Sequence, residues 1–175
     1  MSISPRILIF TGDGKGKTTA ALGMALRAAG HGIRTRVIQF IKADATVGEL
    51  RALPQLQQVE IVQTGLGFVP NPTATAWPKH QAGAGEGLRL AKAAMADARF
   101  GLVILDEICV AVALGLLKED DVIAAVRQAH PGNRVVLTGR GATPGLIALA
   151  DTVTNMQCVK HGFQAGIPAQ EGVER

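Results

Sequence analysis

The feature that most constrains this chain is a glycine-rich segment at residues 12–18, Gly-Asp-Gly-Lys-Gly-Lys-Thr. It follows an apolar stretch at residues 6–11, which has the length and composition of a buried strand. It precedes residues 17–29, whose apolar side chains recur with helical spacing before two closing glycines. A strand that runs through a glycine loop into a helix is typical of α/β proteins that bind phosphate groups.

The segment matches most of the phosphate-loop pattern G-x-x-x-x-G-K-[ST]. Gly16-Lys17-Thr18 fit its end, whereas Thr11 stands in the place of the first glycine. In such a loop, successive backbone N–H groups point inward around phosphate oxygens, with a lysine as cation and a hydroxyl for Mg²⁺. The alternative is a glycine-rich turn with incidental lysines. The predicted ATP-binding residues here are Gly12, Asp13, Gly14, Lys15, Gly16, Lys17, Thr18 and Thr19.

Strands and helices alternate along the rest of the chain. We expect strands at 6–11, 35–41, 59–63, 102–105, 134–138 and 152–156, and helices at 17–29, 49–53, 79–98, 120–129 and 144–150. Short connections between them predict a mainly parallel sheet with helices on both faces, the α/β class of RecA-like P-loop NTPases. Residues 1–175 are predicted to form a single domain. The irregular, partly apolar segment 65–78 is expected to be a functional or mobile loop.

Composition narrows the function classes. The net charge is +4, but the basic residues are scattered and aromatic residues make up only 3%, so we do not expect nucleic-acid binding. No stretch has the length of a signal peptide core or a membrane span. Cys109 and Cys158 lack the spacing of a metal or redox motif. A cytoplasmic protein is therefore expected, without a membrane partner.

A second motif lies at the end of the apolar strand 102–105. Asp106 and Glu107 follow it, as expected of an acidic residue held toward a bound metal; the alternative is that Asp106 caps the next helix. Arg140 follows the strand at 134–138, at the edge where such sheets bind ligands. We expect it to contact the nucleotide or a closing loop, with a surface ion pair as the alternative.

Further motifs in the same order complete a resemblance to a known family. The motifs are Thr11-Gly12-Asp13-Gly14-Lys15-Gly16-Lys17-Thr18-Thr19-Ala20-Ala21, Gln39-Phe40-Ile41-Lys42, Leu105-Asp106-Glu107, Thr138-Gly139-Arg140-Gly141, Leu149-Ala150-Asp151-Thr152-Val153 and Lys160-His161-Gly162-Phe163-Gln164-Ala165-Gly166-Ile167. With these motifs in this order, the chain closely resembles the phosphate-loop class of ATP:corrinoid adenosyltransferases over nearly its whole length.

The resemblance implies transfer of the 5′-deoxyadenosyl group of ATP to the cobalt(I) of a reduced corrinoid, with release of triphosphate. Cobalt(I) is itself the nucleophile, which agrees with the lack of a convincing serine–histidine or cysteine–histidine pair. Lys17 is then a catalytic residue that stabilises the leaving triphosphate. Thr18 and Glu107 match the positions that bind Mg²⁺ in the family, with Asp106 in support. Asp13 replaces the commoner asparagine.

The resemblance also implies where the corrinoid binds. Leu66 and Phe68 fall where the family uses hydrophobic or aromatic side chains to exclude the lower ligand of cobalt, so that Phe68 would act in catalysis. Trp77 is a further corrinoid-binding candidate. Alternatively, Leu66 and Phe68 only pack beneath the loop.

Partners and alternative functions remain open at the level of sequence. The family suggests a homodimer, and an electron-donating flavoprotein would be compatible with it. Two alternatives to the adenosyltransferase are a P-loop ATPase or small-molecule kinase with Glu107 as base, and a non-catalytic nucleotide-gated corrinoid carrier. The sequence does not select among cobalamin, cobinamide and earlier corrinoids as substrate.

Overall fold

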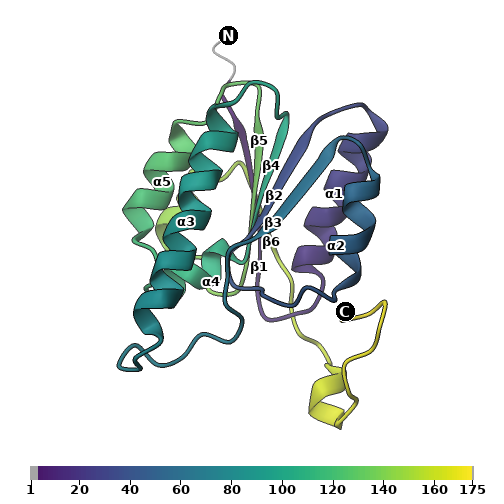
Figure 1. Ribbon diagram of the computed structural model, residues 1–175, viewed down its shortest axis with the longest axis vertical. Helices are drawn as coiled ribbons and strands as arrows, with labels where there is room; N and C mark the ends of the chain where they lie inside the picture. Colours follow the sequence, from purple (N-terminus) through teal and green to yellow (C-terminus); the bar gives the residue numbers. More distant parts are fainter. Residues whose placement is uncertain (1–3, 175) are drawn as a thin grey trace.

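A computed structural model describes residues 4–174, and in it six strands form one parallel sheet in the order β3-β2-β4-β5-β1-β6 (Figure 1). The strands are β1 (Arg6–Thr11), β2 (Thr35–Gln39), β3 (Val59–Gln63), β4 (Leu102–Asp106), β5 (Arg134–Thr138) and β6 (Thr152–Asn155). The helices are α1 (Lys17–Gly30), α2 (Gly48–Ala52), α3 (Trp77–Ala96), α4 (Ile108–Ala113), α5 (Glu119–Arg127) and α6 (Pro144–Leu149), with 3-10 turns η1 (Leu53–Gln55) and η2 (Gly162–Ala165). The predicted α/β class is confirmed.

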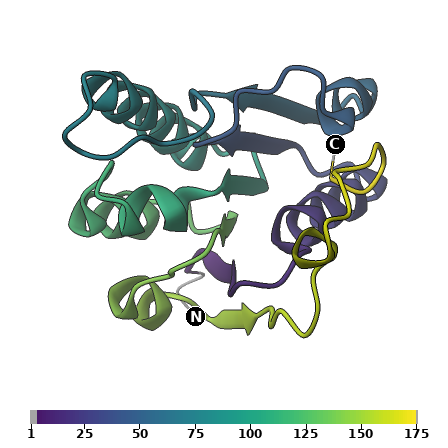
Figure 2. The ribbon, with the colours of Figure 1, turned by 90° about the horizontal axis from the view of Figure 1, so that it is seen from below.

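Helices cover both faces of the sheet. Helices α1 and α2 lie on one side, and α3, α4, α5 and α6 lie on the other (Figures 1 and 2). On the first side the alanines Ala21, Ala25 and Ala28 of α1 pack against strand residues such as Ile104 and Val136. Small side chains let this helix approach the sheet closely. The larger core cluster fills the opposite side.

The central strand β4 has the burial expected of a parallel sheet that is covered on both faces. All five of its residues are buried, which suits a continuous apolar run rather than an alternating one. Its neighbours β2 and β5 bring further buried valine, isoleucine and leucine, so the core needs few aromatic residues. No helix among the described residues is long and apolar enough to cross a membrane.

The structure differs from the sequence predictions mainly at element ends. Helix α3 begins at Trp77 rather than at 79, because Pro78 is accepted in the first turn, where its missing N–H has no helical partner. Helix α4 was not predicted, since its run of β-branched residues favours a strand. Strand β2 ends at Gln39 rather than 41, level with Asp106 at the end of β4.

The carboxyl ends of the strands form the edge on which the site is built. The glycine loop follows β1, and Gln39, Asp106 and Thr138 end β2, β4 and β5. In Figure 2 this edge faces the viewer, and the segment after β6 passes below the sheet toward α1 and α2. Parallel sheets commonly bind ligands at this edge.

Candidate active site

The glycine loop is held in place from behind by the segment after β6. The Met156 N–H donates to the Thr11 carbonyl at 2.8 Å, and the Gly14 N–H donates to the Met156 carbonyl at 2.7 Å. A Cβ on Gly14 would lie 2.6 Å from the Gln157 carbonyl oxygen, closer than real Cβ atoms come. Gly16 adopts φ 118°, a left-handed conformation that turns the chain into α1. Glycine is therefore required by close packing at position 14 and by backbone conformation at position 16.

Lys17 folds back over this loop. Its Nζ donates to the Gly12 carbonyl at 2.7 Å and to the Gly14 carbonyl at 2.6 Å, and the residue is buried. Burial lowers the pKa of Lys17, Arg140 lowers it further, and the carboxylates of Glu107 and Asp13 oppose the shift. The ammonium is thus at the loop, surrounded by carbonyls, where an anionic ligand would offer it stronger partners.

Asp106 is the polar centre of the strand ends. Its carboxylate is fully buried, and Oδ1 accepts hydrogen bonds from the hydroxyls of Thr18 at 2.8 Å and Thr138 at 2.7 Å. Oδ2 accepts from Gln39 Nε2 at 3.0 Å. These donors come from α1, β5 and β2, so the buried charge ties three elements together. Helix α4, which follows, begins without a side-chain cap, so these contacts do not support the alternative that Asp106 only caps that helix.

Lys42 brings a second ammonium to this point. Its Nζ lies 3.1 Å from Asp106 Oδ2, 3.2 Å from Thr18 Oγ1 and 3.5 Å from Glu49 Oε1. The side chain is 27% exposed, so the ion pair faces the cavity while Asp106 stays inside. Gln39, Lys42 and Glu49 were not among the predicted site residues. The Gln39–Lys42 motif was the sequence signal for the first two and carried no assigned role, whereas Glu49 was noted only as the start of a short helix.

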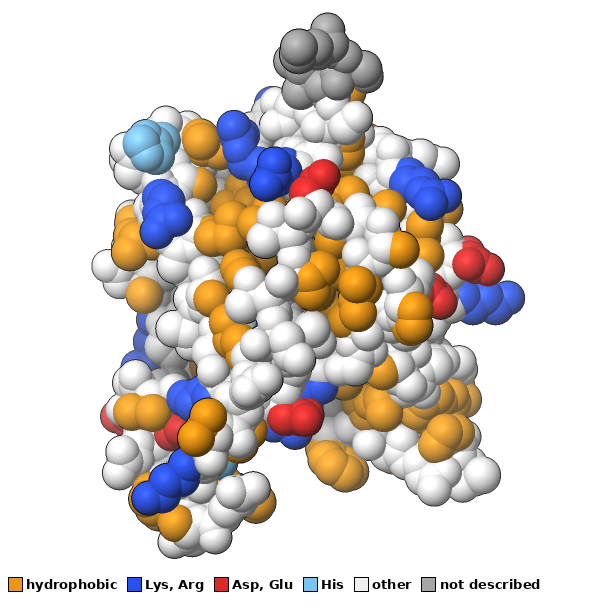
Figure 3. All heavy atoms as spheres, turned by 180° about the vertical axis from the view of Figure 1, so that it is seen from behind, with side chains coloured by type: hydrophobic (Ala, Val, Ile, Leu, Met, Phe, Trp, Pro, Cys, Tyr) orange, Lys and Arg blue, Asp and Glu red, His pale blue; other side chains and the backbone are white. Residues whose placement is uncertain are grey.

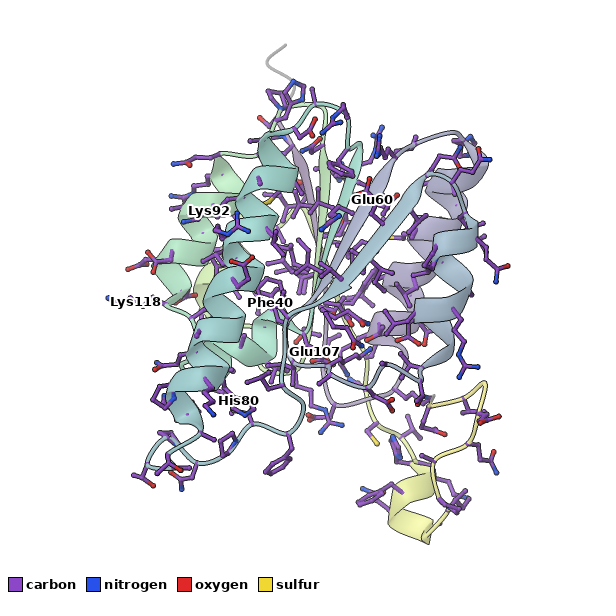
Figure 4. The ribbon with its side chains drawn as sticks, in the orientation of Figure 1. Phe40, Glu60, His80, Lys92, Glu107 and Lys118 are labelled. Atoms are coloured by element: carbon purple, nitrogen blue, oxygen red, sulfur yellow. The ribbon has the colours of Figure 1, made fainter. Side chains whose placement is uncertain are left out.

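Glu107 lies beside this group, at the lower end of the strands in Figure 4. It is the non-glycine residue with positive φ among the described residues, at 64°, and its N–H donates to Thr138 Oγ1 at 2.9 Å. This left-handed turn lets the chain leave β4 and enter α4 while the side chain stays at the cavity. Burial raises the pKa of Glu107, and the neighbouring Asp106 raises it further.

A cavity of about 440 Å³ gathers most of the predicted nucleotide and metal residues. Those that line it are Gly14, Lys15, Gly16, Lys17, Thr18, Thr19, Glu107 and Arg140. Lys42, Glu49, His161 and three residues near the C-terminus also line it. A single concave site therefore contains cations, backbone amides at a helix start and oxygen ligands, as a triphosphate and its metal require.

Two predicted ATP-binding residues do not line this cavity. Gly12 packs against Asn155 and Met156 and does not line it, and Asp13 lines a neighbouring cavity of about 870 Å³ together with Arg140, which borders both. Lys15 pairs with Glu174 at 3.6 Å rather than with Asp13. The C-terminal segment thus closes one wall of the site.

The predicted corrinoid-binding residues separate into two groups. Phe68 is 93% exposed and lines a third cavity of about 410 Å³, bordered also by Lys42 and Glu174, while Leu66 is 52% exposed. At this exposure the Phe68 ring buries little of its surface against the rest of the described chain. Trp77, by contrast, is partly buried against the main core at the start of α3 and is not among the residues that line these three cavities.

The chemistry of the donors fits magnesium. Thr18 offers a hydroxyl, and Asp106 and Glu107 offer carboxylates, all hard oxygen ligands. Within residues 4–174, no group of three or more histidine, cysteine or acidic side chains could hold a metal ion alone. Magnesium commonly uses only one or two carboxylates and completes its shell with phosphates and water, so this sparse set is compatible with it.

Comparison with known proteins gives a consistent match. The family model for ATP:corrinoid adenosyltransferase BtuR/CobO/CobP matches residues 4–175. A corrinoid adenosyltransferase of Pseudomonas aeruginosa is 41% identical over 171 residues, which covers 96% of this chain and 82% of that protein. The corrinoid adenosyltransferase CobA of Salmonella typhimurium is 40% identical over 174 residues, and that of Escherichia coli K12 is 38% identical over 169 residues; each comparison covers 96% of this chain and 84% of the relative.

Proposed function

This chain belongs to the family of ATP:corrinoid adenosyltransferases, and from its site we propose how individual residues carry out that reaction. The reaction moves the 5′-deoxyadenosyl group of ATP to cobalt(I) of a reduced corrinoid. The C5′–O bond to the triphosphate breaks, and a carbon–cobalt bond forms with the electron pair of cobalt(I). The protein therefore has to hold the two substrates in line and stabilise the triphosphate that leaves.

The glycine loop and Lys17 are proposed to hold the triphosphate. The observation that carries this is the position of the Lys17 ammonium, 2.7 and 2.6 Å from two loop carbonyls and inside the cavity that Arg140 also lines. When triphosphate binds, the Lys17 ammonium would donate to charged phosphate oxygens instead of neutral carbonyls, and each of its hydrogen bonds would become stronger. The charge on the leaving oxygen would then be met by groups that are already in place.

Thr18 and Glu107 are proposed to hold Mg²⁺, with Asp106 fixing the Thr18 hydroxyl. Bound magnesium would neutralise charge on the triphosphate. The 2.8 Å hydrogen bond from Thr18 to Asp106 supports this arrangement, because it fixes the hydroxyl hydrogen on the buried carboxylate and leaves the oxygen lone pairs for a cation. Glu107 lines the same cavity as Thr18, which places its carboxylate where a cation held by that hydroxyl could reach it.

Phe68 and Leu66 are proposed to contact the corrinoid from the loop after β3. Both side chains are exposed, and Phe68 lines an open cavity next to Lys42, which supports this role. Trp77 packs against the core, which supports a structural role for its indole ring. A single domain over 1–175, a homodimer, a flavoprotein reductant and a cytoplasmic location remain predictions from the sequence.

The product of the reaction tests this proposal. The protein is incubated with Mg²⁺, ATP and chemically reduced cobalamin, cobinamide or earlier corrinoids, and products are separated by chromatography. Adenosylated corrinoid and intact triphosphate in equal amounts are expected, and the best substrate identifies the natural corrinoid. ADP and phosphate without a cobalt–carbon bond would indicate the alternative ATPase, and binding of both ligands without turnover would indicate a carrier.

A further inference from the structure

Lys42 occupies a position that the proposed reaction does not use. The loop after β2 carries it to the cavity, where its ammonium lies 3.1 Å from Asp106 Oδ2 and 3.2 Å from Thr18 Oγ1. Asp106 is fully buried, and the other described groups that reach its carboxylate, from Thr18, Thr138 and Gln39, are neutral. Lys42 is therefore the cation that balances a carboxylate which would be unfavourable to bury alone.

One of these two oxygens, Thr18 Oγ1, is a proposed magnesium ligand, and the other belongs to Asp106, the carboxylate that fixes the Thr18 hydroxyl. An ammonium within 3.2 Å of the Thr18 hydroxyl and a divalent cation on that hydroxyl would repel each other strongly at such short range. The lysine side chain has four flexible carbons and is 27% exposed toward the cavity, so it has room to swing away. Glu49, 3.5 Å away at the start of α2, offers a neighbouring carboxylate that keeps the ammonium inside the cavity.

From these contacts we propose that Lys42 is an internal counter-cation that exchanges places with Mg²⁺. It neutralises Asp106 before the metal binds, and the metal displaces it. The displaced ammonium stays in the cavity lined by the glycine loop, where it binds the triphosphate beside Lys17. Lys42 thus couples metal loading to binding of the triphosphate. The inference rests on the proposed magnesium site.

This exchange predicts opposite effects on two ligands. In Lys42→Gln, Mg²⁺ alone no longer competes with an ammonium, so its dissociation constant should fall by about tenfold or more. Inorganic tripolyphosphate, added at saturating Mg²⁺, loses a charged partner, so its dissociation constant should rise by about tenfold. A residue with a merely structural role would not shift the two affinities in opposite directions.

Affinity for Mg²⁺ is measured by thermal unfolding at increasing Mg²⁺ concentration, since a ligand that binds only the folded state raises the unfolding midpoint temperature as its concentration rises. Affinity for tripolyphosphate is measured by isothermal titration calorimetry. Lys42→Arg keeps the charge and should stay close to wild type in Mg²⁺ affinity. Lys92→Gln removes one lysine from the exposed side of α3, where Figure 4 labels it, and controls for net charge. Equal Mg²⁺ affinity in Lys42→Gln and Lys92→Gln would overturn the exchange, as would unchanged tripolyphosphate binding.

A further variant separates this inference from the proposed metal site. Thr18→Ala removes the hydroxyl that is proposed to bind Mg²⁺. If Thr18→Ala binds Mg²⁺ as wild type does, the proposed metal site is wrong, and the exchange is overturned with it. If Thr18→Ala loses Mg²⁺ binding while Lys42→Gln and wild type bind it equally, the metal site stands and only the role of Lys42 is overturned.

Discussion

The hydroxyl of Thr18 donates a 2.8 Å hydrogen bond to Oδ1 of Asp106, 88 residues further along the chain. It joins the first turn of α1 to the end of β4, so the phosphate loop and the acidic strand end are held together before any ligand binds. The first prediction follows from this link.

Asp106→Asn should destabilise the protein and weaken Mg²⁺ binding. The substitution keeps the shape but removes the nearer of the two carboxylate partners of Lys42 and places an amide NH₂ against hydrogen-bond donors. We therefore expect a loss of about 2–4 kcal/mol in the free energy of unfolding. Urea unfolding with and without Mg²⁺ measures both effects. Asp121→Asn, exposed on α5, should stay within about 0.5 kcal/mol of wild type. Equal stability of the two variants would contradict the central role of Asp106.

Lys17→Ala should nearly abolish adenosylation while the protein stays folded. Removing a cation that meets charge on the leaving triphosphate is expected to lower the rate by about 10²-fold or more. The free energy of unfolding should fall by only about 1–2 kcal/mol, since the bonds to Gly12 and Gly14 are local. Single-turnover rates and urea unfolding check the two parts.

Lys15→Ala provides the comparison for Lys17. The Lys15 ammonium pairs with Glu174 at the surface, so its removal should reduce the rate far less. Comparable rate losses in the two variants would mean that general positive charge in the loop, rather than the placement of Lys17, supports the reaction.

Gly12, in the glycine loop, lies so close to the end of β6 and the segment after it that a side chain there should destabilise the protein. Gly12→Ala places a Cβ against Asn155 Oδ1 and the Met156 backbone, at a residue with φ 94°, and should cost at least about 2 kcal/mol. Gly23→Ala adds a Cβ in the middle of α1 that would meet no atom within 4 Å beyond its chain neighbours and the backbone of its own helix, and should stabilise by about 0.5–1 kcal/mol. Thermal unfolding of the pair measures the difference. A neutral Gly12→Ala would show that the loop is free to move away from this segment.

Phe68 and Trp77 should respond differently to truncation. Phe68→Ala should leave the free energy of unfolding within about 0.5 kcal/mol, because the ring is 93% exposed, but should slow adenosylation more from cobalt(II) than from pre-reduced cobalt(I). Trp77→Ala should cost about 2–3 kcal/mol, because the indole packs on the core. Equal rate losses from both cobalt states in Phe68→Ala would argue against ligand exclusion by this ring.

The sequence predicted the parts of the site that are local in the chain. The glycine loop, Lys17 and Thr18 follow from one motif, and Asp106 and Glu107 from the end of an apolar strand. The role of Lys42 could not be predicted in this way. It depends on the pairing of Gln39 with Asp106 across β2 and β4, which brings a lysine and an aspartate 3.1 Å apart although they lie far apart in the sequence.

Surface residues also differ in how far the sequence could predict their placement. The basic residues are scattered along the sequence, and on the face shown in Figure 3 the lysines and arginines are likewise spread out. Exposure decided between Phe68 and Trp77, which look alike as aromatic residues in one proline-rich loop. Sequence spacing carries no information on which of two such rings faces solvent, because irregular segments have no periodicity.

The last prediction concerns acid stability and lies away from the active site. Glu60 on β3 accepts hydrogen bonds from Arg34 Nε at 3.0 Å and from Arg36 Nη1 at 2.6 Å. The hydrogen bond from Arg34 is the largest cause that lowers the pKa of Glu60 below its ordinary value of 4.5. Folding therefore favours the charged carboxylate.

The lowered pKa determines how the stabilising contribution of Glu60 changes with pH. The contribution of Glu60 is present above pH 4.5 and is lost as pH falls through the lower pKa of the folded state. Glu60→Gln should reduce the free energy of unfolding by about 0.5–1 kcal/mol at pH 7, since the carboxylate is partly exposed and screened, and by less at pH 3. Urea unfolding at both values measures the change. Glu86→Gln, which removes an exposed pair with Arg89 on α3, should show a smaller difference between the two pH values; a pH-independent effect of Glu60→Gln would mean that packing, not charge, accounts for its contribution.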